Sequence, residues 1–247
     1  MPKRSVWIGY DDREQEAFAV ARTSVVKHAP ANVEVHSLIL SELQEAGLYT
    51  RPIAANGDGR MKDVISDAPM STQFAVSRFL VPTLLHTSSF PPYGWAMFCD
   101  CDVLVRKSLE PLFEMVEAHP EKALFCVPHQ QKVAPGATKM DGQVQTSYQR
   151  KNWSSVMLLN GDHPSNNKMG LVHANTVPGR DLHRFDWLDD SEIGFLDEKW
   201  NWLVGHSGEC VDPAIVHFTD GGPWLPKYMD VKFANEWMRA WDWLGKP

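Results

Sequence analysis

The sequence has no long apolar run and no excess of positive charge. The first absence argues against a membrane-spanning protein, and the second argues against a nucleic-acid-binding protein. No stretch approaches the roughly 20 consecutive apolar residues that a membrane-spanning helix needs, so we expect no membrane span. Acidic residues outnumber basic ones by 31 to 24, which gives a formal net charge of -7. Without a global positive field, nucleic acid is not an expected partner, and any anionic ligand must be bound by local groups.

Cysteine is also scarce, and internal repeats and low-complexity segments are absent. The four cysteines lie in or beside apolar stretches, without the spacing of a zinc site or a disulfide framework. This usage suits a reducing compartment, and the start of the chain leads directly into a predicted strand, so we expect a cytoplasmic protein. The 247 residues, 43% of them hydrophobic, suffice for one large core, and we interpret 1–247 as a single domain.

Short apolar runs alternate with amphipathic segments along most of the chain. Strands are predicted at 6–10, 33–38, 95–99, 123–127, 155–159 and 215–218. Helices are predicted from a capping box of Asp12 and Gln15, and at 72–85, 109–117, 200–204 and 228–244. This alternation indicates an α/β sandwich with a mainly parallel central sheet, and such sheets bind ligands at the carboxyl ends of their strands.

Two acids, in Asp100-Cys101-Asp102, directly follow the apolar run 95–99, which is typical of a strand covered on both faces. In an extended segment both carboxylates project to one side, and Cys101 projects to the other. Two such carboxylates can share one hard divalent cation with positions left open for diphosphate oxygens. The alternative is a pair of acids that caps a turn at the end of a strand.

His217 lies in the predicted strand 215–218 and is a candidate third ligand, because imidazole binds manganese-like ions. The alternative is a hydrogen-bonded core histidine. Gly221 and Gly222 follow it, and glycine allows backbone amides to approach phosphate oxygens closely. The alternative for both glycines is a tight turn.

Three further charged side chains could meet an anionic or nucleotide ligand. Arg78 interrupts an apolar helix face, so its guanidinium needs an anion, either a diphosphate or a carboxylate such as Asp63 or Asp100. Lys62 follows a glycine-rich loop and could reach phosphates, although a solvated surface lysine is the simpler interpretation. Asp11 stands where the first strand ends and could accept hydrogen bonds from a base or ribose.

Together these segments resemble the GT-A glycosyltransferases, especially the retaining group that is similar to glycogenin and the bacterial lipopolysaccharide galactosyltransferases. The matching segments are the first strand with Asp11, Ser77-Arg78-Phe79, Asp100-Cys101-Asp102, residues 155–160, Trp200-Asn201 and residues 217–224. The resemblance implies the GT-A (Rossmann-like) α/β/α sandwich and transfer of a hexose from a nucleotide-sugar to an acceptor hydroxyl with retention at the anomeric carbon.

The resemblance also implies a set of ligand contacts. Asp100, Asp102 and His217 would bind Mn²⁺ or Mg²⁺, Asp11 would lie near the nucleoside, and Arg78 would lie near the donor. The base would be uridine, so the implied donor is a UDP-sugar.

Three positions depart from the family's pattern. Gly222 stands where the family often has a lysine, so that phosphate contact is missing or is supplied by Lys227. Trp153-Ser154-Ser155 replaces the usual Asn-Ser-Gly, which changes the sugar-binding contacts. The family's Asp-Gln pair near the reacting sugar has no clear counterpart, and Asp189 and Asp190, in about the same region, are the catalytic candidates.

Other classes of protein remain as alternatives. A magnesium-dependent phosphatase of the haloacid-dehalogenase type also has an Asp-x-Asp after a strand, but normally after the first strand and with a threonine or valine where Leu104 stands. A nucleotidyltransferase would need a basic glycine-rich loop where Asp11 and Asp12 lie. A non-catalytic sugar-binding module would need no metal ligands. The acceptor is a carbohydrate or another hydroxyl compound, and the polar loop 129–151 is the expected place for its contacts.

Overall fold

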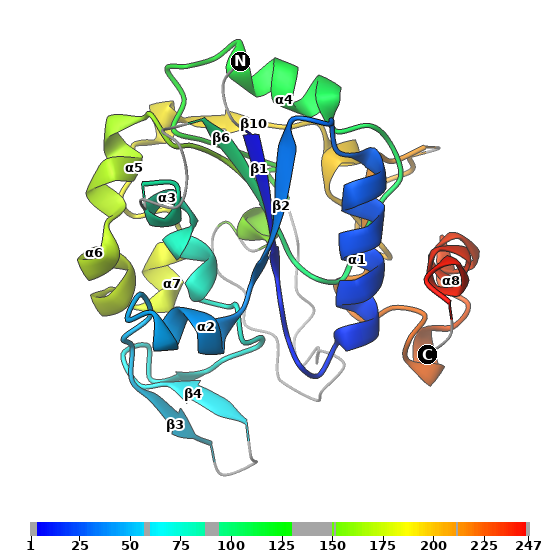
Figure 1. Ribbon diagram of the computed structural model, residues 1–247, viewed down its shortest axis with the longest axis horizontal. Coiled ribbons are helices and arrows are strands. Elements are labelled where there is room, and N and C mark those ends of the chain that lie inside the picture. The colour runs from blue at the N-terminus through cyan, green and yellow to red at the C-terminus, as the bar shows by residue number, and fades with distance from the viewer. Residues whose placement is uncertain are drawn as a thin grey trace.

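The centre of the molecule is a twisted six-stranded sheet with helices on both faces (Figure 1). A computed structural model of the chain describes residues 4–56, 60–86, 94–129, 150, 152–210 and 212–245. In spatial order the strands are β10 (Ile193–Phe195), β8 (Leu124–Cys126), β9 (Val156–Asn160), β6 (Trp95–Cys99), β1 (Arg4–Gly9) and β2 (Val33–Leu38). Within this sheet β9 runs antiparallel to its neighbours and the other pairings are parallel, so the predicted α/β fold with a mainly parallel sheet is confirmed.

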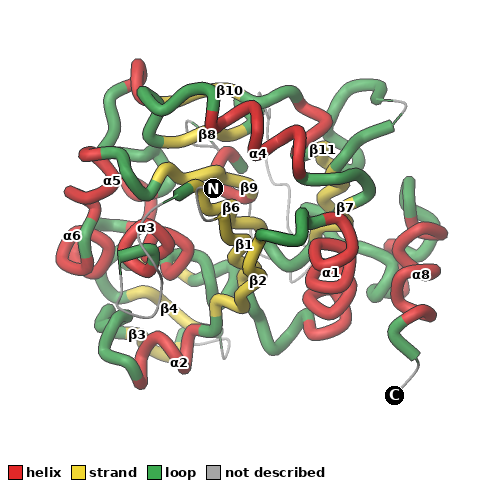
Figure 2. Tube along the Cα trace, turned by 45° about the horizontal axis from the view of Figure 1, so that its top comes forward, coloured by secondary structure: helices red, strands yellow, loops and turns green. Residues whose placement is uncertain are grey.

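Alternate residues of the central strands pack into separate cores on the two faces of the sheet. In β1, Val6 and Ile8 join one core, while Trp7 joins the other. The first face carries α1 (Gln15–His28) and α4 (Glu110–Glu117), and α8 (Ala234–Trp243) packs outside α1. The second face carries α2 (Leu40–Glu45), α3 (Val81–Leu84), α5 (Pro164–Met169), α6 (Leu171–Thr176) and α7 (Gly179–Leu182) (Figure 2).

Two small sheets lie beside the central one. The first has the order β11 (Trp202–Leu203), β12 (Ile215–His217), β7 (Val103–Val105), and the second consists of β3 (Ile53–Ala55), β4 (Met61–Asp63) and β5 (Ala68–Pro69). Because β12 pairs antiparallel with β7, His217 lies opposite Val103. This register brings His217 next to the acidic pair that precedes β7.

The strand predictions hold better than the helix predictions. Strands 33–38 and 95–99 are confirmed to the residue, and the other four are shifted or shortened at their ends. The predicted helix 72–85 is wrong in its first half, where turns lead to a 3₁₀ helix, Ser77–Leu80, ahead of α3. Pro82 has no N–H for a continuous α-helix across this segment.

Three helix boundaries predicted from the sequence are also wrong. The first helix has no capping box, since Glu14 is its N-cap and makes no side-chain cap bond. Residues 200–204 form the end of a 3₁₀ helix, Glu198–Trp200, and then β11. The helix prediction failed here because a short apolar run fits both the helical period and the strand period. The closing helix begins at Ala234, after Phe233 with a φ of 69° interrupts the predicted span.

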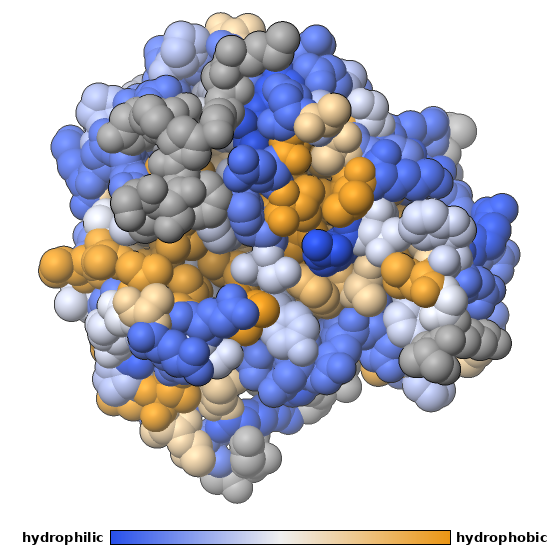
Figure 3. All heavy atoms as spheres, in the orientation of Figure 1, coloured by the Kyte–Doolittle hydropathy of each residue, from blue (hydrophilic) through white to orange (hydrophobic). Residues whose placement is uncertain are grey.

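The surface and the cysteines complete the description of the fold. Hydrophilic side chains cover much of the face drawn in Figure 3, and apolar residues form a band from its left edge to its middle, with smaller patches elsewhere. None of the helices among the described residues is long and apolar enough to cross a bilayer. All four cysteines are free thiols. Most of the loop 129–151 and the centre of the loop 56–60 lie outside the described residues.

Candidate metal and donor site

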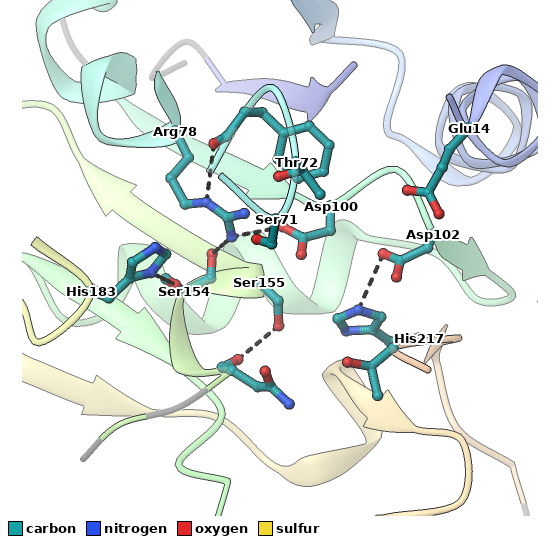
Figure 4. A pocket seen from close by; sticks show the side chains of 13 residues that line it. Glu14, Ser71, Thr72, Arg78, Asp100, Asp102, Ser154, Ser155, His183 and His217 are labelled. Atoms are coloured by element: carbon teal, nitrogen blue, oxygen red, sulfur yellow. Dashed lines mark hydrogen bonds and ion pairs between the residues drawn. The ribbon is translucent and has the colours of Figure 1, made fainter. Parts of the chain in front are cut away.

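A cavity of about 100 Å³ lies at the carboxyl end of β6 (Figure 4). Asp100 follows β6 directly, and its backbone N–H donates to the Ser155 carbonyl 2.9 Å away. Since β9 runs antiparallel to β6, the start of β9 lies at this same edge, with Ser154 and Ser155 on the cavity. The sheet therefore joins two segments that the sequence analysis singled out separately.

Asp100, Asp102 and His217 meet at this cavity. Each offers one ligand atom, and these three atoms lie within 4.8 Å of one another. Asp102 lies in a turn and not in the extended segment that the sequence suggested, yet both carboxylates line the cavity. Cys101 is fully buried and its thiol donates to Glu14 Oε2 at 3.3 Å, so it forms the wall behind the acids. Burial raises the pKa of the Cys101 thiol well above its ordinary value.

The orientation of the His217 ring is fixed by Asn201. His217 Nδ1 lies 3.0 Å from Asn201 Oδ1, an atom that only accepts, so Nδ1 carries the hydrogen. Asn201 is itself held, because its Nδ2 donates to Ser155 Oγ at 2.9 Å. The other ring nitrogen, Nε2, then lies 3.1 Å from Asp102 Oδ1. In neutral histidine these two acceptor atoms face each other, and a cation or a proton between them relieves the repulsion.

Arg78 is buried and pairs with Asp100, one of the two carboxylates that the sequence analysis offered. Its Nη1 donates to Asp100 Oδ1 at 2.8 Å and to the Ser154 carbonyl at 2.9 Å. The guanidinium also lies over the rings of Phe74 and Phe98, 5.2 and 5.0 Å from their centroids. Arg78 lines the cavity, so it can hold Asp100 in place and still present positive charge to an anion.

Asp11 is fully buried, and its carboxylate is engaged by neighbours. It accepts hydrogen bonds from the Arg13 backbone and guanidinium, and from the Gln73 N–H at 3.0 Å. Burial alone would raise the pKa of Asp11, but the Arg13 contacts outweigh it and hold the pKa below its ordinary value. Asp11 therefore stabilises the turn after β1 through these hydrogen bonds, and its contact with a nucleoside stays a prediction.

Glu14 lines the cavity although nothing in the sequence distinguished it from the exposed acids around it. Its side chain is only 5% exposed. Burial, followed by the nearby Asp102 charge, raises the pKa of Glu14 to about 8. The site thus contains three carboxyl groups, with Arg78 and His217 as their basic neighbours.

Ser154 and His183 form a second hydrogen-bonded pair on the cavity wall. Ser154 Oγ lies 2.7 Å from His183 Nδ1, and Phe79 meets the same imidazole edge-on. Ser155 Oγ donates to the Asn152 carbonyl at 2.7 Å. His183 was not predicted, because it lies in a polar stretch after α7 whose position follows only from the fold.

Asp11, Cys101, Gly221 and Gly222 are not among the residues that line this cavity, and neither are four further sequence-predicted site residues. Lys62 forms an ion pair with Asp67, and Lys227 is exposed, with Nζ 5.2 Å from the Tyr228 ring centroid. Asp189 caps a 3₁₀ helix, Asp190–Glu192, and Asp190 forms an ion pair with Arg150. The phosphate contacts of the two lysines and the catalytic roles of the two acids stay predictions.

Gly221 and Gly222 have the tight-turn role that was the alternative for them. The Gly221 N–H donates to the Phe218 carbonyl at 2.7 Å, and its φ is 131°. A Cβ on Gly222 would lie 1.9 Å from the Trp224 ring. Packing and backbone conformation therefore require both glycines, whatever ligand binds nearby.

The comparison with curated proteins gives one strong match. Over 246 residues the chain is 38% identical to Protein CDI of Arabidopsis thaliana, and the match covers 98% of this chain and 87% of that protein. No protein-family model matches the chain.

Several solved structures with a similar fold are glycosyltransferases. Among them are GlyE of Streptococcus pneumoniae (TM-score 0.58, 15% identity) and the galactosyltransferase LgtC, determined with donor and acceptor sugar analogues (TM-score 0.55, 13% identity). The bifunctional glycosyltransferase WbbM is also similar (TM-score 0.60, 15% identity). The matches cover 97–98% of this chain, 97% of LgtC, 60% of GlyE and half of WbbM. At these identities the likeness shows the fold, and the expected GT-A fold is confirmed.

Proposed function

Because the chain belongs to the family of Protein CDI and has the GT-A fold, we propose that it is a metal-dependent glycosyltransferase. It transfers a hexose from a nucleotide-sugar, with a UDP-sugar as the first candidate, to a hydroxyl of a carbohydrate or another acceptor. The observation that carries the proposal is the meeting of Asp100, Asp102 and His217 at the carboxyl end of β6. The fold similarity favours this function over the phosphatase and the sugar-binding module.

The donor set fits a hard divalent cation such as Mn²⁺ or Mg²⁺. Two carboxylates and one imidazole are ordinary ligands for such ions, and three ligands leave positions for diphosphate oxygens. When bound, the cation would neutralise the charge that develops on the leaving diphosphate. His217 is held ready for this role by Asn201, and Asp100 by Arg78.

The chain's own residues would act on the donor in two ways. Arg78 adds a fixed positive charge beside Asp100, in a partly closed cavity where electrostatic interactions are stronger than in water. Ser154 and Ser155 offer short polar side chains where the family usually has Asn-Ser-Gly, and their hydroxyls could contact the sugar. The uridine base, retention, a single domain over 1–247 and the cytoplasmic location rest on the sequence alone.

The test measures melting temperature with Mn²⁺, with UDP, and with both. We expect the two together to raise it by more than the sum of their separate effects, because a bound cation offsets the repulsion between the diphosphate and the carboxylates of the cavity. Asp102→Asn should abolish this joint shift, while Asp242→Asn, at an exposed position of α8, should keep it. No joint shift with any nucleoside diphosphate would contradict the proposal. Hydrolysis of a panel of nucleotide-sugars with Mn²⁺ would then identify the donor.

A further inference from the structure

A second cavity, larger than the metal and donor cavity, is lined by residues of α1, α8 and the β7 segment, and we call it the α1–α8 groove. Its volume is about 700 Å³, which is within the range of about 300–1,000 Å³ for ligand pockets. Among the described residues, none lines both cavities. In Figures 1 and 2 α8 lies beside α1, on the opposite side of the molecule from α5 and α6. The groove is therefore a surface that the proposed glycosyl transfer does not use.

The two helices present similar pairs of side chains to this groove. Arg22 and Val26 are four residues apart on α1, and Arg239 and Trp243 are four residues apart on α8, so each pair shares one face of its helix. Val26 is 52% exposed and Trp243 is 76% exposed. Apolar side chains that are exposed together in one concavity, beside cations, are typical of a binding surface.

Most of the positive charge in the groove is not neutralised within the described part of the chain. Arg22 and Lys27 make no ion pair with a described residue, and Arg239 donates to a carbonyl of its own helix. Among the described lining residues the one acid, Glu236, is already paired with Arg106 at 2.7 Å. The groove therefore offers three cationic side chains on a chain whose net charge is -7.

We propose that the α1–α8 groove binds an acidic peptide segment of a partner protein. An apolar side chain of that segment packs against Val26 and Trp243, and its carboxylates meet Arg22, Lys27 and Arg239. Charge complementarity selects this occupant, because the acidic remainder of the chain repels such a segment everywhere else. The concave shape suits a peptide laid between two helices better than the flat surface of a bilayer.

The experiment begins with a phage-displayed library of random dodecapeptides, selected on the unmodified full chain at low salt. We expect the enriched peptides to carry at least two acidic residues next to an aromatic or aliphatic one. A labelled copy of the most enriched peptide is then titrated by fluorescence anisotropy. Enrichment of neutral or basic peptides, or no enrichment at all, would overturn the proposal.

Variants of the groove test where the peptide binds. Arg22→Glu combined with Lys27→Glu should weaken binding at least about 10-fold, because attraction becomes repulsion. Lys168→Glu combined with Arg180→Glu makes the same change in net charge at exposed positions of α5 and α7, and it should weaken binding less than about twofold.

Trp243→Ala tests the apolar part of the contact. It should weaken binding about 5- to 30-fold, since truncated tryptophans are among the costliest losses at interfaces. The melting temperature of each variant checks that it folds. Binding that survives both the charge reversal and Trp243→Ala would place the peptide elsewhere and overturn the proposal.

Two other occupants are outcomes of the same set of variants. If no acidic peptide is selected and the charge reversal abolishes sedimentation with phosphatidylserine vesicles, the groove is a membrane surface and the peptide proposal is overturned. It is also overturned if the reversal instead abolishes self-association in sedimentation velocity, since the occupant is then a second copy of the chain. None of these measurements needs a metal or a nucleotide, so their failure leaves the proposed glycosyl transfer untouched.

Discussion

Two buried arginine–aspartate pairs in the described part of the chain differ in what surrounds them. Arg51 and Asp63 are both almost completely buried and meet through two hydrogen bonds, Nε to Oδ1 at 2.9 Å and Nη2 to Oδ2 at 2.5 Å. Arg51 Nη1 also donates to the carbonyls of Ala174 and Val177. Arg78 and Asp100 share one bond at 2.8 Å, and Asp100 remains 16% exposed at the cavity.

This difference separates a structural pair from one suited to binding. The Arg51–Asp63 pair uses its hydrogen-bonding capacity inside the protein, where it joins β4 to α6 and to the residue that follows α6. The Arg78–Asp100 pair keeps a carboxylate and a positive charge at the wall of a cavity, where a ligand can reach both. The two pairs look alike in the sequence, as one arginine and one aspartate each, and only their surroundings distinguish them.

The largest expected effect comes from breaking the enclosed pair. Arg51→Met would leave the buried Asp63 carboxylate without its cation, and we expect a loss of about 3–5 kcal/mol in the free energy of unfolding. Urea denaturation measures this loss. Arg22→Met, at an exposed position of α1, is the control and should change stability by no more than about 0.5 kcal/mol. A loss below about 1 kcal/mol for Arg51→Met would mean that the pair is not structural.

Breaking the cavity pair should cost less stability and more binding. Arg78→Met leaves Asp100 close to solvent, so we expect a loss of about 1–3 kcal/mol in the free energy of unfolding. The joint melting shift with Mn²⁺ and UDP should disappear, because the positive charge beside the diphosphate is gone. If Arg78→Met kept this shift while Arg51→Met lost it, the assignment of the two pairs would be reversed.

Glu14 is a buried acid to which no arginine is hydrogen-bonded, in contrast to Asp63 and Asp100. We therefore expect its ionisation to make the free energy of unfolding depend on pH. Its pKa is raised from 4.5 to about 8, so the folded protein keeps a proton that the unfolded chain loses across this window. Stability from this group therefore falls as pH rises from 4.5 to 8. Relative to the unmodified protein without metal, Glu14→Gln should gain on the order of 3 kcal/mol between about pH 5 and pH 9. Melting curves over this range test it, with Glu16→Gln as the control, and a constant difference would contradict it.

The smallest effect is expected at the exposed pair of Lys62 and Asp67, whose side chains are 34% and 86% exposed. Lys62→Met should change the free energy of unfolding by less than about 1 kcal/mol, because solvent screens such pairs. The joint melting shift should also stay the same, since Lys62 does not line the cavity. A loss of that shift would restore the phosphate contact that the sequence suggested.

Several strands of the central sheet were easier to predict than the helices, because every residue of β1, β6, β8 and β9 is buried. All five residues of β6 are buried, so the apolar run itself marks the strand and its ends. Around residues 77–84 the apolar residues also satisfy a helical period, but Pro82 and local turns divide that segment into 3₁₀ and α pieces. The period of a pattern predicts which residues are buried more reliably than it predicts the hydrogen bonds between them.

The candidate site could be predicted only where local sequence and position on a strand coincided. Asp100 and Asp102 follow the buried strand β6, and His217 ends β12, so the pattern of strands indicated all three. Glu14 and His183 reach the cavity because distant elements pack against β6, and the residues around them carry no comparable signal. Lys62 was suggested by its place after a glycine-rich loop and Lys227 by the family's pattern, and neither residue lines the cavity.

The pairing of β12 with β7 has a consequence for the unfolding of the chain. His217 belongs to the last part of the sequence, while Asp100 and Asp102 follow a strand at the centre of the main sheet. An ion bound to all three would act as a cross-link that closes a loop of nearly half the chain, much as a disulfide does. Removing the ion would then loosen the segment from β11 to α8 first, and protease cleavage there would report the loss before the central sheet unfolds.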